Sequence, residues 1–356
     1  MNTSTIDYII VGQGFAGTML AWQLHAKNIP FIIIDDNHHE SSSLVSAGIM
    51  NPITGMRLTH NKKYLKQFTY AKQIYTAVGK LINAEVLHPI DVLRFFTRPE
   101  EISAWQKNTK KLEETKCINK PFNHKHLSHI FNNTDGGLHI KNAAYLSTNV
   151  LLKESAKFFK ENNYLKNEKF NTDDIILKKN SVSWKNSEAK KIIFCEGFKN
   201  NVNPWFKEVP FVSAKGDLLT IRIEDPTFPQ HLINFGKFIL PLGDNLYRVG
   251  ATYIWDNLDL TCENAGRDTI LTALREFLKV DFEVVEHTCG IRPIVKDQKP
   301  ILGMHPKHNQ IAIFNGLGSK GALYAPFYAR ELINHLHDNK SIEPNISVQR
   351  FKSTLL

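Results

Sequence analysis

The sequence predicts an α/β protein in which a parallel sheet draws strands from both ends of the chain and is interrupted by an antiparallel sheet with helices. Three observations support this fold. Residues 6–35 follow the order strand, glycine-rich turn, helix, strand. Residues 211–253 alternate apolar and polar side chains with a period of two, which is typical of antiparallel strands. Residues 311–337 return to a strand, a glycine-rich turn and a helix.

The first segment contains the three parts of a dinucleotide-binding fingerprint in order. Apolar residues 6–11 predict a buried parallel strand, and residues 18–27 predict a helix whose N-terminus can hold a pyrophosphate. Asp35 ends the next strand, where its carboxylate can bind a ribose 2′-OH and would repel the 2′-phosphate of NADP, with Asp36 beside it. The turn residues expected to contact the cofactor are Gly12, Gly14, Phe15, Ala16 and Gly17. This pattern predicts a Rossmann-type domain, and by itself leaves NAD and FAD open.

The remaining elements follow from apolar periodicity and from glycine, proline and polar breaks. Helices are expected at residues 62–83, 100–114, 145–168, 264–278 and 322–337, and strands at residues 92–97, 190–195, 218–222, 238–240, 247–251, 282–287 and 311–315. A loop is expected at residues 41–57. This order predicts a discontinuous cofactor domain, residues 1–85, 140–210 and 288–356, and a substrate domain, residues 86–139 and 211–287.

Composition bounds the class of protein. With 356 residues, 42% hydrophobic and 22% charged, the chain is long enough for two domains with ample cores. The net charge of +9 comes from scattered lysines and arginines, so a nucleic-acid partner remains possible but is not expected. The four cysteines show no CxxC pair, which predicts reduced thiols and no metal site. We expect no signal peptide, no membrane span and a cytoplasmic location.

The C-terminal part identifies a family. Gly290-Ile291-Arg292-Pro293, residues 297–303 and residues 313–322 resemble the D-amino-acid oxidase superfamily of FAD-dependent oxidoreductases. The resemblance is strongest to the glycine oxidase and sarcosine oxidase branches and to the FAD module that acts on carboxymethylaminomethyl-uridine in tRNA. It covers essentially the whole chain and implies FAD as the cofactor.

The resemblance also assigns cofactor contacts. Ser46, Ala47 and Gly48 resemble the small-residue loop that wraps the flavin. A second glycine-rich turn before a helix brings backbone N–H groups and a helix dipole to one place, where charge grows on the N1–C2=O edge of the reduced flavin. Its residues are Gly316, Gly318, Ser319, Lys320 and Gly321, and Gly197 follows the buried strand at residues 190–195.

Three residues are expected to act on the substrate. Arg292 can bind a carboxylate with two hydrogen bonds. Arg248 stands where the related sarcosine oxidases place a lysine near flavin N5, although a surface salt bridge is an equal alternative. Tyr253 is expected to line the same pocket, because Phe238 replaces a tyrosine of glycine oxidase. Cys289 falls near the cysteine that holds flavin covalently in sarcosine oxidases, so covalent attachment stays an alternative.

Together these features predict an FAD-dependent oxidoreductase that oxidises a carboxylate-bearing amine or amino acid. The resemblance implies hydride transfer to flavin N5 and reoxidation by O2 or another acceptor. Two alternatives are an FAD enzyme acting on a carboxymethylaminomethyl-uridine-like secondary amine in tRNA, and a flavin-binding protein without turnover. The sequence leaves open which amine is oxidised, which acceptor is used and the oligomeric state.

Overall fold

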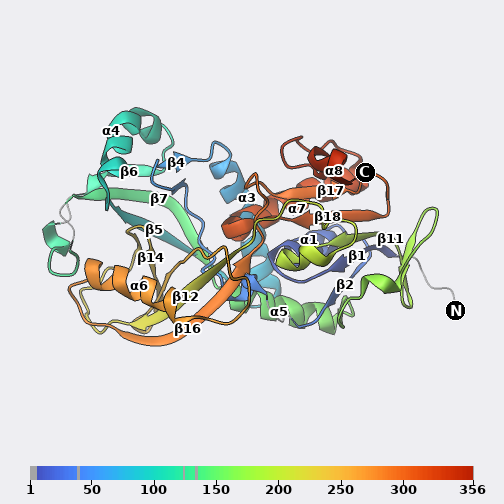
Figure 1. Ribbon diagram of the computed structural model, residues 1–356, viewed down its shortest axis with the longest axis horizontal. Coiled ribbons are helices and arrows are strands. Elements are labelled where there is room, and N and C mark those ends of the chain that lie inside the picture. The colour runs from blue at the N-terminus through green and yellow to red at the C-terminus, as the bar shows by residue number, and fades with distance from the viewer. Residues whose placement is uncertain (1–5, 38–40, 123–124, 133–134, 356) are drawn as a thin grey trace.

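The computed structural model describes residues 6–37, 41–122, 125–132 and 135–355. Residues 1–5, the start of the segment in which we expect no signal peptide, lie outside the described residues. Two large sheets lie side by side. In Figure 1 the sheet that contains β1 and β2 is on the right, and the sheet that contains β12 and β16 is on the left.

The first sheet has the strand order β17-β18-β11-β1-β2-β8, and β10 pairs with β11 on one side and with β9 on the other. Its strands are β1 (Ile6–Val11), β2 (Phe31–Asp35), β8 (Leu165–Asn167), β9 (Ile175–Leu177), β10 (Val182–Trp184), β11 (Ser187–Phe194), β17 (Ile301–Met304) and β18 (Ile311–Asn315). β1 pairs in parallel with β2 and β11, and β11 pairs in parallel with β18. The central strands therefore come from both ends of the chain, as the sequence predicts.

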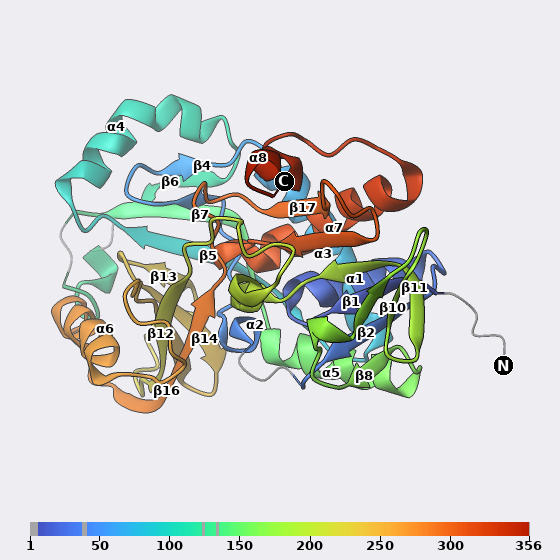
Figure 2. The ribbon, with the colours of Figure 1, turned by 45° about the vertical axis from the view of Figure 1, so that its right-hand side comes forward.

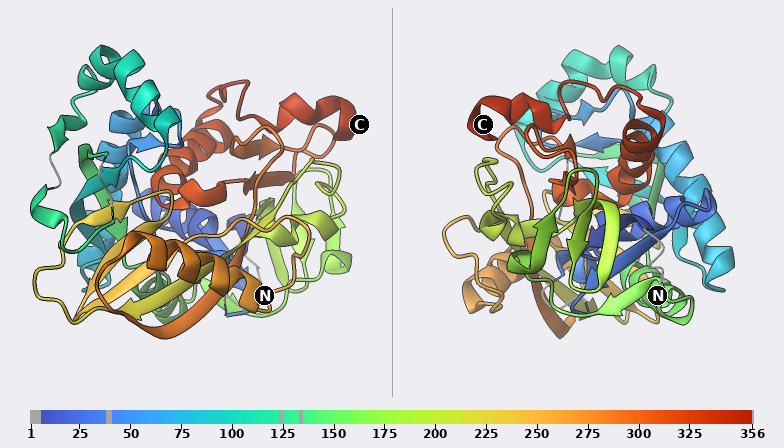
Figure 3. Two further views of the ribbon diagram at one scale, coloured as in Figure 1. Left: turned by 60° about the vertical axis from the view of Figure 1, so that its left-hand side comes forward. Right: turned by 90° about the vertical axis from the view of Figure 1, so that its right-hand side faces the viewer.

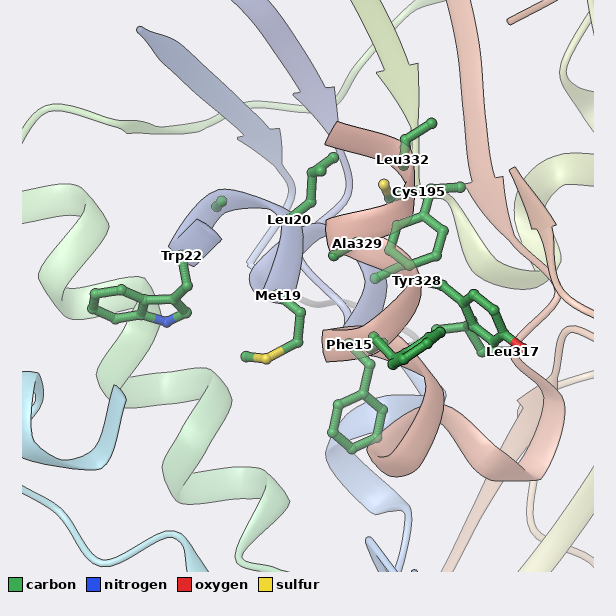
Figure 4. Close-up of a cluster of buried hydrophobic side chains, with 14 of the residues drawn as sticks. Phe15, Met19, Leu20, Trp22, Cys195, Leu317, Tyr328, Ala329 and Leu332 are labelled. Atoms are coloured by element: carbon green, nitrogen blue, oxygen red, sulfur yellow. The ribbon is translucent and has the colours of Figure 1, made fainter. Parts of the chain in front are cut away.

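Among the described residues, six helices accompany this sheet. They are α1 (Phe15–Ala26), α2 (Ser42–Val45), α3 (Tyr64–Leu81), α5 (Thr148–Glu161), α7 (Gly321–Asp338) and α8 (Lys352–Leu355). Of these, α1, α5 and α7 pack directly on its strands. Helix α1 is buried from Phe15 to Leu24, because it packs between the sheet, α5 and α7. Figure 4 shows α1 beside α7, and Met19 and Leu20 of α1 belong to one buried cluster with Ala329 and Leu332 of α7. Burying such aliphatic side chains contributes about 1.5–3 kcal/mol each.

The second sheet has the order β16-β12-β15-β14-β13-β5-β7-β6. Its strands are β5 (Leu87–Phe95), β6 (Ile118–Phe122), β7 (Gly137–Leu146), β12 (Ala214–Arg222), β13 (Leu232–Asn234), β14 (Phe238–Gly243), β15 (Leu246–Gly250) and β16 (Glu283–Arg292). Every neighbouring pair is antiparallel except β13 and β5, which are parallel. The predicted antiparallel sheet is therefore present, with one parallel pair.

Helix α6 (Asn264–Phe277) packs against the second sheet, and α4 (Pro99–Glu113) lies near β6. Figures 2 and 3 show α6, in orange, beside β12 and β16. Ile270 and Leu274 of α6 join Leu219 and Val249 of the sheet in one buried cluster. A short two-stranded sheet, β3 (Ile53–Thr54) with β4 (Thr59–His60), completes the fold. Within the described residues, no helix has the length and apolarity that a membrane crossing needs.

Several predicted boundaries differ from the structure. The helix predicted at residues 145–168 is shorter, because residues 137–146 form β7 between β5 and β6. That strand contains polar residues, which hide its period. The predicted domain boundaries at residues 140 and 288 fall inside β7 and β16. The division into two domains at those residues stays a prediction.

Candidate active site

A cavity of about 980 Å³ opens between the two sheets. The carboxyl ends of the parallel strands supply one wall, as in other open α/β sheets that bind ligands there. Gly12, Asp35, Glu196 and Asn315 are on that wall and follow or end β1, β2, β11 and β18. The antiparallel sheet supplies the opposite wall. The cavity therefore touches both the predicted cofactor segments and the predicted substrate segments.

The first glycine turn is closely packed. Gly12 has a positive φ of 95°, and a Cβ there would lie 2.7 Å from the carbonyl oxygen of Cys195. Gly12, Gly14, Phe15 and Ala16 line the cavity. Gly17 is not among the described residues that line the cavity. A Cβ at Gly17 would overlap the carbonyl oxygen of Gly12, so only glycine fits at this position. Gly17 thus lets α1 pack against the turn and makes no contact with the cavity.

The predicted ribose carboxylates lie beside that turn. Asp35 and Asp36 both line the cavity. The backbone N–H of Gln13 donates to Asp35 Oδ2 at 2.8 Å, so the carboxylate also fixes the turn. Lys199 Nζ lies 3.4 Å from Asp36 Oδ2. Gln13 is buried, and its Oε1 has no hydrogen-bond partner among the described residues, which leaves an acceptor for a hydroxyl of a bound group.

The second glycine turn leads into α7. Gly318, Ser319, Lys320 and Gly321 line the cavity, and burial lowers the pKa of Lys320. Gly316 is not among the described residues that line the cavity. It has a positive φ of 70°, and a Cβ there would lie 2.7 Å from Val295 Cγ2, so it serves the turn and its packing.

The N-termini of α1 and α7 meet at the cavity. A Cβ at Gly321 would lie 2.8 Å from Phe15 Cδ2, which shows how closely the two helix starts approach. Neither helix has a hydrogen-bonding side chain at its N-cap. The first N–H of α1, at Phe15, donates to Ser43 Oγ at 3.1 Å. The other N–H groups and the positive potential of the two helix N-termini gather in one place, which favours an anionic or electron-rich group.

The small-residue loop also reaches the cavity. Ser46, Ala47 and Gly48 line it, and Gly48 has a positive φ of 63°. A Cβ at Gly48 would lie 2.6 Å from the carbonyl oxygen of Leu146, at the end of β7. Gly197 lines the cavity as well, and its carbonyl oxygen accepts a hydrogen bond from Asn315 Nδ2 at 2.8 Å. These backbone cradles fit an elongated dinucleotide such as FAD.

A partly buried acid, Glu196, lies on the wall that the parallel strands supply. Glu196 follows β11, and its Oε2 accepts a hydrogen bond from Asn203 Nδ2 at 2.7 Å. Burial raises the pKa of Glu196 to about 7. We did not predict this residue as part of the site. Its place at the carboxyl end of a buried parallel strand was the signal that could have identified it.

Arg292 ends β16 on the opposite wall. Its Nη1 donates to the carbonyl oxygen of Thr252 at 3.2 Å, and its Cζ lies 4.3 Å from the centroid of the Tyr253 ring. The guanidinium also lies against Gly216, where a Cβ would collide with it. Among the described residues, no carboxylate oxygen lies close enough to a guanidinium nitrogen of Arg292 to form a salt bridge. The guanidinium therefore has donors left for an anion.

Lys237 lies on the same wall and was missed by sequence reasoning. Its Nζ donates to the carbonyl oxygen of Ala251 at 2.9 Å. Burial lowers the pKa of Lys237, and the nearby charge of Arg292 lowers it further. No local pattern singles out a lysine after Gly236, because its position depends on how the strands pair.

Arg248 does not lie in the predicted substrate pocket, so its position differs from our prediction. It is not one of the described residues that line the cavity. Its Nη2 lies 3.6 Å from Glu286 Oε2, and its Nη1 lies 3.5 Å from the carbonyl oxygen of Val45. Arg248 shares a strand face with Gly250, but two residues along a strand are a displacement of about 6.6 Å. Gly250 reaches the cavity and Arg248 does not, so the salt-bridge alternative describes its surroundings.

The cysteines also differ from expectation. Cys262 and Cys289 form a disulfide, whereas Cys117 and Cys195 are free and buried. With its sulfur bonded to Cys262, Cys289 has no thiol for covalent attachment of a flavin. Asp217, Cys262 and His287 offer ligand atoms within 4.8 Å of one another, but that sulfur is in the disulfide. The sequence did not show the pair because 27 residues separate its members.

Comparisons with known proteins give the family. Residues 7–335 match the DAO family, described as FAD dependent oxidoreductase. Glycine oxidase of Bacillus subtilis is 28% identical over 134 residues, which are 37% of this chain and 36% of that protein. A bifunctional ThiO/ThiG protein of Trichormus variabilis is 29% identical over 161 residues, 42% of this chain, and the match spans 24% of that relative's length.

Solved structures show the same fold. Glycine oxidase from Geobacillus kaustophilus superposes with a TM-score of 0.80 at 17% identity, covering 96% of each chain. The family match extends over most of the chain and agrees with the cradles around the cavity. The chain belongs to the DAO family of FAD-dependent oxidoreductases, and its cofactor is FAD.

Proposed function

We propose that this protein oxidises an amine or amino acid that carries a carboxylate. The observation that carries the proposal is the guanidinium of Arg292, which opens onto the cavity with no carboxylate of the described residues paired to it. An arginine held by a carbonyl oxygen and an aromatic ring is ready to bind a planar carboxylate with two charge-assisted hydrogen bonds. The similarity to glycine oxidases supports the same class of substrate.

Each residue of the substrate wall has a proposed role. Arg292 binds and orients the substrate carboxylate, and Tyr253 stacks on the guanidinium to hold its plane. Phe238 and Leu218 supply apolar surface that excludes water from the reacting carbon. Arg248 has no part in this proposal because it pairs with Glu286.

The cofactor residues are proposed from the cavity wall. Asp35 would accept hydrogen bonds from the ribose, and the turn that holds Gly12 and Gly14 would hold the pyrophosphate. The N-terminus of α7, with Lys320, would face the electron-rich edge of the flavin. Bound FAD supplies two-electron chemistry, in which the substrate loses a hydride from carbon and a proton from nitrogen, becomes an imine and is hydrolysed, while O2 or another acceptor later takes the electrons.

The test is anaerobic mixing of the FAD-loaded protein with a panel of amines. Glycine, sarcosine, D-amino acids and proline represent carboxylate-bearing substrates, and a modified uridine with a secondary amine represents the tRNA alternative. We expect at least one of the carboxylate-bearing amines to bleach the flavin absorption. Bleaching by the modified uridine alone would favour the tRNA alternative, and no bleaching by any amine would favour a flavin-binding protein without turnover.

A further inference from the structure

Two cations share the substrate wall of the cavity. Lys237 and Arg292 both line it. The carbonyl oxygens of successive residues hold them, since Lys237 Nζ lies 2.9 Å from the oxygen of Ala251 and Arg292 Nη1 lies 3.2 Å from that of Thr252. The two positive groups are therefore anchored at neighbouring points of one backbone segment, and each also faces the cavity.

The described residues place no acid on this wall. The acids that line the cavity, Asp35, Asp36, Glu168 and Glu196, come from the side of the parallel sheet. Asp217 lies near Arg292 but is fully buried, and it accepts hydrogen bonds from Thr252 Oγ1 at 2.7 Å and contacts His287 Nε2 at 2.9 Å. No salt bridge of the described residues neutralises Lys237 or Arg292.

Like charges in a partly buried site repel each other, and a bound anion relieves that repulsion. One carboxylate can accept two parallel hydrogen bonds from the guanidinium of Arg292. The ammonium of Lys237 then remains without a counter-charge, although a lysine ammonium can donate three hydrogen bonds and uses one on Ala251. A substrate with a single carboxylate leaves this second cation unused.

We propose that the substrate carries two acid groups: Arg292 binds the carboxylate next to the reacting carbon, and Lys237 binds a second carboxylate of the same molecule. The substrate class is a dicarboxylate amine, either an N-carboxyalkyl glycine or an acidic amino acid. This inference rests on the proposed oxidation of a carboxylate-bearing amine. It makes Lys237 a residue that determines specificity rather than one that takes part in the oxidation.

The test uses thioethers, which imitate the amines but have no nitrogen to oxidise. Thiodiglycolate has two carboxylates and (methylthio)acetate has one. Binding of each to the FAD-loaded protein is followed by the change in the flavin spectrum, at constant ionic strength. We expect thiodiglycolate to bind at least about tenfold more tightly, as a charge-assisted hydrogen bond predicts.

Variants then assign the preference to Lys237. Lys237→Met should abolish the preference for thiodiglycolate and leave the binding of (methylthio)acetate within about threefold of wild type. Lys237→Arg should keep the preference. Lys207→Met removes the same charge from an exposed position outside the cavity and should change nothing. The flavin absorption per protein reports in every variant whether the cofactor is retained.

Two results would overturn the proposal. Equal binding of the two thioethers by the wild-type protein would do so without any variant. An equal loss of both in Lys237→Met would show that Lys237 only positions Ala251. These outcomes are separate from the proposed oxidation, because the thioethers report binding alone. A thioether preference without bleaching by any amine would refute the oxidation and leave the dianion site standing.

Discussion

The guanidinium of Arg292 lies on the ring of Tyr253, with 4.3 Å between Cζ and the ring centroid. Tyr253 is 53% exposed, and its ring centroid lies 6.1 Å from that of Trp255. The ring therefore forms part of the cavity edge and holds the plane of the arginine at once. A planar group held in this way presents its donors in a fixed direction.

Tyr253→Leu should weaken substrate binding because it removes this stacking. A partly exposed cation–π contact contributes about 0.5–2 kcal/mol, so KM for the amine should rise about two- to thirtyfold. Tyr253→Phe keeps the ring and should keep KM near that of wild type. Steady-state kinetics check the prediction, and an equal rise of KM in both variants would show that the hydroxyl matters rather than the ring.

Asp35→Ala should weaken FAD binding without unfolding the chain. The carboxylate is placed to bind the ribose and also accepts the N–H of Gln13. Loss of a charge-assisted hydrogen bond costs about 1.5–3 kcal/mol, which is about ten- to a hundredfold in affinity. Asp35→Asn can still accept from Gln13 but lacks the charge, so it separates the two roles. Unchanged FAD retention in equilibrium dialysis would remove Asp35 from the ribose site.

Glu196 should make the stability of the FAD-free protein depend on pH. Burial raises the pKa of its carboxyl from the ordinary 4.5 to about 7. Between these values the folded chain holds a proton that the unfolded chain has lost. Stability from this group therefore falls as the pH rises from about 4.5 to about 7, by about 3 kcal/mol in all.

Glu196→Gln should reduce that fall. Urea unfolding at pH 5, near the start of this window, and at pH 8.5, beyond its end, measures the free energy of unfolding before and after most of the fall. Glu208→Gln, an exposed acid, is the matched control and should keep the wild-type difference. If Glu196→Gln also keeps that difference, Glu196 does not titrate in this range.

Replacing Cys262 and Cys289 together by serine should lower the free energy of unfolding by about 3.5 kcal/mol, as expected for a loop closed across 27 residues. The loss arises because the disulfide restricts the unfolded chain and ties the segment after Tyr253 to β16. A reducing agent should lower the free energy of unfolding of the wild-type protein to that of the variant and should not change the free energy of unfolding of the variant. A wild-type protein that does not respond to reduction would contradict the role of this disulfide.

The parallel sheet could be predicted because its signals are local. Apolar strands followed directly by glycine turns, at residues 6–17 and 311–321, specify both the fold and the place of the cofactor. The roles of individual glycines could not be separated in this way. Gly17 and Gly316 turned out to serve packing and the turn, because which glycine faces the cavity depends on neighbours far away in the sequence.

The substrate wall was predicted less completely because strand pairing builds it. The alternation of apolar and polar residues predicts on which face of β15 Arg248 lies, but it does not predict how far along the strand the cavity extends. Lys237 meets Arg292 only because β14, β15, β12 and β16 are paired in one register. Arg292 itself was found through a motif, since Gly290 and Pro293 surround it in the sequence.

The most direct test of the proposed function compares Arg292→Leu with wild type on two amines. One is the carboxylate-bearing amine that bleaches the flavin fastest, and the other is its analogue without the carboxylate. We predict unchanged FAD content and a fall of about 10²–10⁴ in kcat/KM for the first amine, since two charge-assisted hydrogen bonds are lost, with a much smaller fall for the second. An equal fall for both amines, or loss of FAD, would show that Arg292 does not bind the substrate carboxylate.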